Sequence, residues 1–143
     1  MKLRYVNNQN KLDPMNGREI VRGEELEALL DDAQKNMPFV AELCGDNGFE
    51  LVIGIAPDFG CVEHRRIDGD LPYLMAVSTQ PRMKGGYVEF LMTDTPTPIA
   101  ARYIISFGEL KKIALHFLKT GERSDLVAWQ VFDPSAMREE TSN

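Results

Sequence analysis

The sequence predicts an α+β domain in which two amphipathic helices pack on a curved, mostly antiparallel sheet of about six to eight strands. Two segments carry apolar residues at helical spacing, and short strand-like segments between them are separated by Gly, Asp, Asn and Pro. The chain has 143 residues, a length at which one core suffices for folding. We therefore expect a single domain over residues 1–132 and a flexible tail over residues 133–143.

The chain begins with a predicted strand and a predicted helix. Leu3 and Tyr5 alternate with polar residues, and polar turn residues follow as far as Gly17. Over residues 23–35 the pattern changes to apolar residues at i, i+3, i+4, i+7 and i+11, namely Leu26, Leu29, Leu30, Ala33 and Met37. Acidic residues occupy the other positions, and Pro38 marks the end. This segment is therefore expected to be a helix with an acidic outer face.

The middle of the chain predicts an antiparallel meander. Five strand-like segments lie close together, over residues 39–44, 49–55, 61–67, 73–78 and 87–93. Short turns join them, and short connections favour antiparallel pairing. Asn47 followed by Gly48 gives the strongest hairpin signal, because both residues accept the positive φ angles of a tight turn.

The carboxy-terminal third predicts a strand ending at Ile105, a second helix and a last strand over residues 126–132. Ser106 and Glu109 have the spacing of a capping box, and Gly121 is suited to end the helix. One face of this helix is apolar, with Phe107, Leu110, Ile113, Ala114, Phe117 and Leu118. We expect it to be central to the core, with Trp129 of the last strand as a packing residue.

Composition and charge argue against several classes of partner. The 16 Lys and Arg against 22 Asp and Glu give a net charge of −6, which repels the phosphate backbone of nucleic acids. No apolar run approaches the roughly 20 residues needed to cross a bilayer, and residues 1–10 lack the apolar core of a secretory signal. We therefore expect a cytoplasmic protein that binds neither nucleic acid directly nor a membrane.

The reactive side chains do not suggest a catalytic or cofactor site. Cys61 and His64 are three residues apart in an expected strand, so they point to opposite faces and cannot form a dyad or chelate one metal. The segment from Lys84 to Gly86 lacks the spacing of a phosphate-binding loop. Cys44 and Cys61 are expected to be free thiols that pack as small apolar groups. We thus expect no metal, no cofactor and no enzymatic activity.

The last third of the chain carries a pattern found in a known family. A Pro-rich strand entry at Thr97 and Pro98 is followed by a helix that ends in the segment from Phe117 to Arg123, and by a short last strand with Trp129. In this order, these features resemble the first numbered family of bacterial immunity proteins from polymorphic toxin systems. The preceding strands match only by general layout. Ser124 is a departure, since many relatives have Pro at this position.

The resemblance implies a protein that binds and inhibits a toxin. Such proteins are commonly encoded beside deaminase-type toxins, so the implied partner is the carboxy-terminal toxin domain of a neighbouring gene's product, of the deaminase or nuclease type. An acidic protein complements the basic groove of a toxin that acts on nucleic acid. Acidic residues crowd one short region, and we expect contacts there from Asp58, Glu63, Asp68 and Asp70, with Phe59 and Tyr73 as anchors.

Other interpretations of the same residues remain open. The acidic cluster is also typical of an ordinary solvated surface. A structural or adaptor module without a toxin partner fits the composition, and an enzyme with a site built from distant residues is a third alternative. An exposed sheet edge can pair with a second copy of the chain or with the toxin, so a homodimer is also among the expectations.

Overall fold

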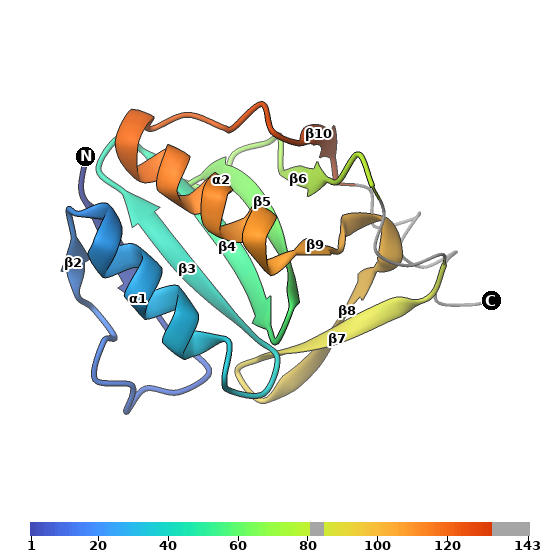
Figure 1. Cartoon of the computed structure of the whole chain (residues 1–143), viewed down its shortest axis with the longest axis horizontal. Helices are drawn as coiled ribbons and strands as arrows, with labels where there is room; N and C mark the ends of the chain where they lie inside the picture. Colours follow the sequence, from blue (N-terminus) through green and yellow to red (C-terminus); the bar gives the residue numbers. More distant parts are fainter. Residues whose placement is uncertain (81–84, 133–143) are drawn as a thin grey trace.

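The computed structural model describes residues 1–80 and 85–132, and within these ranges it confirms the α+β class. A mostly antiparallel, open sheet of ten strands is covered on one face by two helices (Figure 1). Seven strands follow one another across the sheet in the order β10 (Ala128–Val131), β6 (Leu74–Val77), β5 (Phe59–Arg66), β4 (Phe49–Ala56), β3 (Phe39–Gly45), β1 (Leu3–Val6) and β2 (Glu19–Ile20). The expected antiparallel meander holds for β3 to β6. Its fifth expected strand was placed wrongly, because β7 (Tyr87–Met92) pairs parallel with β3 and antiparallel with the strand that follows it.

The two helices and the inner face of the sheet enclose the main core. Helices α1 (Gly23–Ala33) and α2 (Phe107–Thr120) lie side by side over the central strands (Figure 1). Leu30 of α1, Phe117 of α2 and Ile53 of β4 are fully buried in this cluster. All six apolar residues predicted for the second helix are buried. The expectation that this helix is central to the core is confirmed.

The ends of the helices follow local sequence signals. The Ser106 hydroxyl accepts the Glu109 backbone N–H at 3.0 Å, and the Glu109 carboxylate accepts the Ser106 backbone N–H at 2.9 Å, which is the expected capping box. Gly121 ends α2 with a φ of 75°. Helix α1 ends at Ala33, and Met37 is 71% exposed. The placement of Met37 on the apolar face was therefore wrong.

The structure contains more strands than the expected six to eight. Residues 99–105 do not form one strand, because the short 3-10 helix η1 (Ala101–Tyr103) separates β8 (Thr95–Ala100) from β9 (Ile105–Ser106). Strand β8 contains Pro96 and Pro98, and its described pairing is with β7 (Tyr87–Met92) alone. Proline is tolerated in such an edge strand, because the missing N–H falls on the unpaired side. The Pro-rich segment is therefore a strand rather than an entry to one.

The second face of the sheet is only partly covered. The β7–β8 hairpin and η1 cover one end, where Phe90, Cys61 and Tyr103 are buried in a second cluster. At the other end, the side chains of four strands form a surface that we call the open face. It comprises Arg4 of β1, Glu42 and Cys44 of β3, Glu50 of β4, and Glu63 and Arg65 of β5.

Two further expectations were a flexible carboxy-terminal tail and the lack of a membrane-spanning segment. The flexible tail expected over residues 133–143 lies outside the described residues. No helix in the described part of the chain is long and apolar enough to span a membrane.

Candidate functional site

The open face brings charged residues of four strands into one row. Strand register places Arg4 opposite Cys44, Cys44 opposite Glu50, and Glu50 opposite Arg65. Side chains directly opposite one another in neighbouring strands point to the same side of a sheet and lie in contact range. The order along this row is therefore a cation, a thiol, a carboxylate and a second cation.

Arg65 links two of the carboxylates on this face. Its Nε donates to Glu50 Oε2 at 2.8 Å, and its Nη1 lies 3.5 Å from Glu63 Oε1. The Glu50 side chain is only 5% exposed, so its charge depends on this partner. Burial raises the pKa of Glu63, and the positive charge of Arg65 opposes that rise. Arg65 thus holds two carboxylates that would otherwise repel each other.

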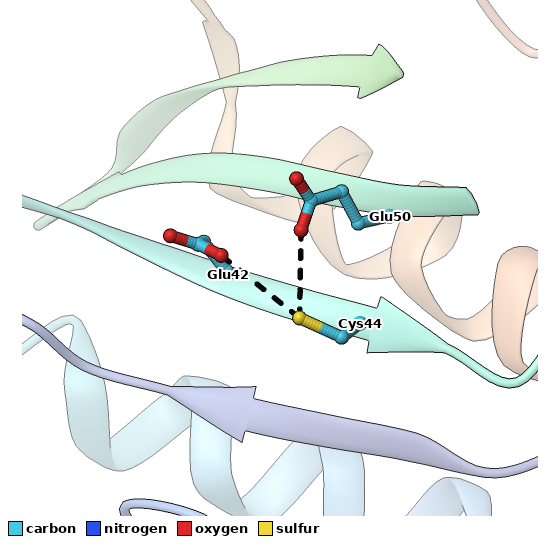
Figure 2. Close-up of side chains that lie close together, drawn as sticks. All are labelled: Glu42, Cys44 and Glu50. Atoms are coloured by element: carbon cyan, nitrogen blue, oxygen red, sulfur yellow. Dashed lines mark hydrogen bonds between the residues drawn. The ribbon is translucent and has the colours of Figure 1, made fainter. Parts of the chain in front are cut away.

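Glu42, Cys44 and Glu50 form a compact group on β3 and β4 (Figure 2). One potential metal-ligand atom from each lies within 4.8 Å of the others. Burial and the neighbouring Glu50 and Glu42 carboxylates raise the pKa of the Cys44 thiol to about 11. The thiol therefore keeps its proton and donates to Glu50 at 3.4 Å and Glu42 at 3.9 Å. The arrangement is a hydrogen-bonded cluster, and the absence of a metal stays a prediction.

The two cysteines differ in environment. Both are free, as expected. Cys61 is buried among apolar side chains of the second cluster, which agrees with its expected packing role. Cys44 is half-buried and hydrogen-bonded to carboxylates, so it is not simply a small apolar group. His64 lies on the opposite side of the sheet from Cys61, packed against Phe117 of α2, so the two side chains do not form a dyad.

A small cavity lies where the open face meets the hairpin. It has a volume of about 180 Å³ and is lined by Glu42, Val52 and Arg65 of the sheet and by Met92 and Thr93 of the hairpin. Thr93 and Asp94 have positive φ angles of 51° and 64°. Such a conformation is uncommon for residues other than glycine and marks the tight turn at the hairpin tip. The open face is therefore bounded by the hairpin rather than flat throughout.

The structure divides the six predicted contact residues into separate groups. Glu63 and Tyr73 both contact Arg65, whose guanidinium is 5.9 Å from the Tyr73 ring. Asp68 and Asp70 share the loop that follows β5, and the Asp70 backbone N–H donates to Asp68 at 3.0 Å. Asp58 lies at the opposite end of β5, an eight-residue strand that spans roughly 23 Å. Crowding in the sequence is therefore not crowding in space.

The two proposed anchors also differ in their surroundings. The Phe59 ring makes an edge contact with Phe90 at 6.3 Å and packs against the second cluster, so much of it is committed to the fold. The Tyr73 hydroxyl donates to the Gly69 carbonyl at 2.8 Å, which fixes the ring beside the loop. Next to it, Leu71 is 75% exposed and Ile67 is 46% exposed. These two exposed apolar side chains were not among the predicted contact residues.

The central residues of the open face were not among the predicted contacts. Glu42, Cys44, Glu50 and Arg65 lie on the same side of three neighbouring strands. On β3 the polar positions alternate with apolar ones, so the signal was present there, whereas on β5 the intervening residue is His64. Pairing them required the strand register, which the turn at Asn47 and Gly48 sets. A polar face on adjacent strands could therefore have been inferred.

Comparison with protein families identifies the chain. The model of the family described as Immunity protein Imm1 matches residues 16–131. The chain belongs to the Imm1 family. The match extends beyond the carboxy-terminal pattern to include both helices and the strands from β2 to β10. No curated protein matches the chain. Imm1 membership gives this protein an immunity role and implies a cognate toxin as its partner.

Two residues of the recurrent carboxy-terminal pattern, Trp129 and the departure Ser124, can be placed in this Imm1 protein. Trp129 is half-buried against the main core, and its indole N–H donates to the Ser124 carbonyl at 2.7 Å. Ser124, which departs from the pattern, is 7% exposed, and its hydroxyl accepts the Leu126 N–H at 3.1 Å. Trp129 is thus a packing residue, as expected, and the departure at Ser124 leaves the connection to β10 intact.

Proposed function

We propose that this Imm1 protein binds the carboxy-terminal toxin domain of a neighbouring gene's product and occludes its active site or substrate groove. The proposed toxin is of the deaminase or nuclease type. The observation that carries the proposal is the family match over residues 16–131. The net charge of −6 supports it, because a toxin domain that grips nucleic acid presents a basic groove to which an acidic inhibitor is attracted.

The proposed contact surface is the loop after β5 together with the adjacent part of the open face. Exposed Asp68 and Asp70 provide negative charge, and exposed Ile67 and Leu71 lie beside them. Tight binding needs apolar anchors as well as charge, because exposed rim charges contribute little affinity by themselves. Glu63 and Tyr73 extend this surface onto the sheet. Asp58 and Phe59, at the far end of β5, remain proposed contacts of a separate patch.

Growth of cells that express the toxin domain encoded immediately upstream tests the proposed function. Induction of the toxin domain alone should stop growth, and co-expression of this Imm1 protein should restore it. Toxicity that persists although both proteins are soluble and folded would contradict the proposal. An unrelated immunity protein serves as the control and should not restore growth.

Reversing the charges of the loop should slow association with the toxin. We expect the double variant Asp68→Lys and Asp70→Lys to lower the association rate constant about tenfold or more at low salt, with a smaller effect at high salt. Stopped-flow or surface-binding kinetics measure this rate. The matched control is Glu24→Lys with Glu25→Lys, which makes the same change in net charge in the first turn of α1. Equal rates for the two double variants would argue against the loop as the contact surface.

An adaptor role is the alternative. In that case the same surface would bind a protein unrelated to any toxin, and co-expression would give no protection. A homodimer is a further proposal. Among the described strands β10 pairs with β6 alone, so its other side offers backbone for pairing, next to the 65% exposed Val131. Sedimentation equilibrium of the isolated chain, and of a Val131→Lys variant, distinguishes a dimer formed along this edge from a monomer.

A further inference from the structure

A cavity of about 310 Å³ lies on the helix side of the molecule, away from the surface proposed above. It is enclosed by the segment after β1, the carboxy-terminal end of α1 and the start of β3, with Leu91 of β7 at its side. In Figure 1 these segments are the blue loop below α1 and the connection that leads into β3. Its volume is at the lower end of the roughly 300–1,000 Å³ typical of ligand pockets.

A buried tyrosine hydroxyl lines this cavity. Tyr5 is 1% exposed, and its hydroxyl makes no hydrogen bond of good geometry among the described residues, although the Asp13 and Asn7 side chains lie close enough to shift its pKa. Burial, with the nearby Asp13 carboxylate, raises the pKa of Tyr5, so the hydroxyl stays protonated and available as a donor and acceptor. Leaving such a group unsatisfied is unfavourable. The wall of the cavity therefore carries a buried hydroxyl that the neighbouring Asp13 and Asn7 side chains satisfy only poorly.

The polar wall beside Tyr5 is held in place by its own network. Asp13 Oδ2 accepts the Asn7 side-chain N–H at 3.0 Å, and Asp13 Oδ1 accepts the Met15 backbone N–H at 2.9 Å. Asn7 is 4% exposed, and its backbone N–H donates to Asn16 Oδ1 at 2.9 Å. Each carboxylate oxygen retains a further acceptor site. The loop thus presents a fixed carboxylate toward the cavity.

The cavity is negatively charged and partly apolar. Asp13 and Asp32 line it, and none of the described lining residues is Lys, Arg or His. Met15, Met37 and Leu91 provide apolar walls, of which Met37 is 71% exposed at the surface. An aliphatic chain with a cationic end matches this combination, because its stem packs on apolar groups while its head meets carboxylates. A forked guanidinium can also bond to two acceptors at once.

We propose that this cavity binds an arginine side chain of the toxin domain, with the guanidinium donating to Asp13 and to the Tyr5 hydroxyl. This inference rests on the proposed function for the identity of the partner. It adds a second contact on the helix side, and half of the residues that line it precede residue 16, where the family match begins. The amino-terminal residues Tyr5, Asn7 and Asp13 would then contribute partner specificity outside the matched part of the chain.

A small-molecule titration tests the cavity without the toxin. The probe is arginine capped as an N-acetyl methylamide, and the matched control is the identically capped citrulline, which has nearly the same shape and no charge. Capped arginine should shift the NMR signals of the Met15 and Met37 methyl groups and of the Asn7 side-chain amide in a saturable manner. Binding of citrulline with equal affinity, or shifts confined to residues elsewhere, would overturn the proposal.

Variants separate a binding role of Tyr5 from a structural one. Tyr5→Phe removes only the hydroxyl, so it should weaken capped arginine about tenfold without lowering the melting temperature. Asp32→Asn should also weaken binding while leaving the bonds of the Asp13 loop intact. Tyr103→Phe changes an equally buried tyrosine in the second cluster and should leave affinity unchanged. Equal affinity of wild type and Tyr5→Phe for capped arginine would overturn the assignment.

Binding to the purified toxin domain is the second experiment. If wild type binds the toxin and Tyr5→Phe binds it about tenfold more weakly, the cavity is an anchor for the partner. Equal binding of both proteins would contradict the anchor while leaving the proposed function intact. Failure of wild type to bind the toxin would instead contradict the proposed function and with it the partner named here, whereas the arginine titration would still report on the cavity itself.

Discussion

Replacing Arg65 with glutamine should lower the free energy of unfolding by roughly 2–4 kcal/mol at pH 7.5. The variant leaves Glu50 with a 5% exposed side chain and without the guanidinium that lies 2.8 Å from its carboxylate. Loss of one partner from a buried pair is costly, because the remaining charge is neither solvated nor neutralised. The Cys44 thiol still donates to Glu50, which places the expected loss below the upper end for such pairs.

The effect of this substitution should depend on pH. Burial raises the pKa values of Glu63 and Glu42, and Arg65 opposes both rises, so the variant raises them further. A carboxyl group with a raised pKa in the folded state contributes stability at acidic pH that is lost as the pH increases. The deficit relative to wild type should therefore be smaller at pH 5 than at pH 8.

Urea denaturation across this pH range measures the deficit. Arg66→Gln is the matched control, because Arg66 is the next residue and pairs with the exposed Asp68; it should leave the stability unchanged. An Arg65→Gln protein as stable as wild type, or one whose deficit grows on acidification, would show that the open face is not organised around this arginine.

His64 should make the protein lose stability on acidification. Its ring is 8% exposed, stacks on Phe49 at 5.0 Å, and meets Phe117 and Trp129 edge-on. Burial, with a smaller effect of the positive Arg123, lowers the pKa of His64 from 6.5 to about 4. The unfolded chain binds a proton in this interval that the folded chain does not, so stability is lost as the pH falls from about 6.5 to 4. The difference corresponds to about 3 kcal/mol.

The variant His64→Phe should remove this component of the pH dependence. Its free energy of unfolding, measured by urea denaturation, should fall by about 3 kcal/mol less than that of wild type between pH 7 and pH 4. Arg123→Gln removes only the lesser cause and should retain most of the wild-type dependence. A His64→Phe protein with the full wild-type loss would mean that other groups carry the acid sensitivity.

Local signals predicted the parts of the fold that depend on neighbouring residues. The Ser106 and Glu109 capping box, the terminating Gly121 and the turn at Gly48, with its φ of 88°, each follow from short-range chemistry. Strand β8 was not predicted, because the tolerance of Pro96 and Pro98 depends on β8 lying at an edge. Met37 was misplaced because the apolar spacing continued past the end of the helix.

The candidate surfaces were harder to predict because they combine residues across the fold. Asp58 and Asp68 are close in sequence, but β5 separates them, so a cluster of acidic residues did not define one patch. The row from Arg4 to Arg65 becomes visible only with the register of four strands. The cavity beside Tyr5 depends on the loop network of Asn7, Asp13 and Asn16, which no periodic pattern in the sequence indicates.

We propose above that this Imm1 protein inhibits a toxin, and occlusion of an active site requires a stoichiometric complex. The most direct test is titration of the purified upstream toxin domain, assayed for deamination and for cleavage of nucleic acid, with the purified chain. We expect activity to fall linearly and to vanish at one equivalent, because a tight complex occludes each toxin molecule once. Full toxin activity in the presence of a large excess of the folded chain would contradict inhibition by this Imm1 protein.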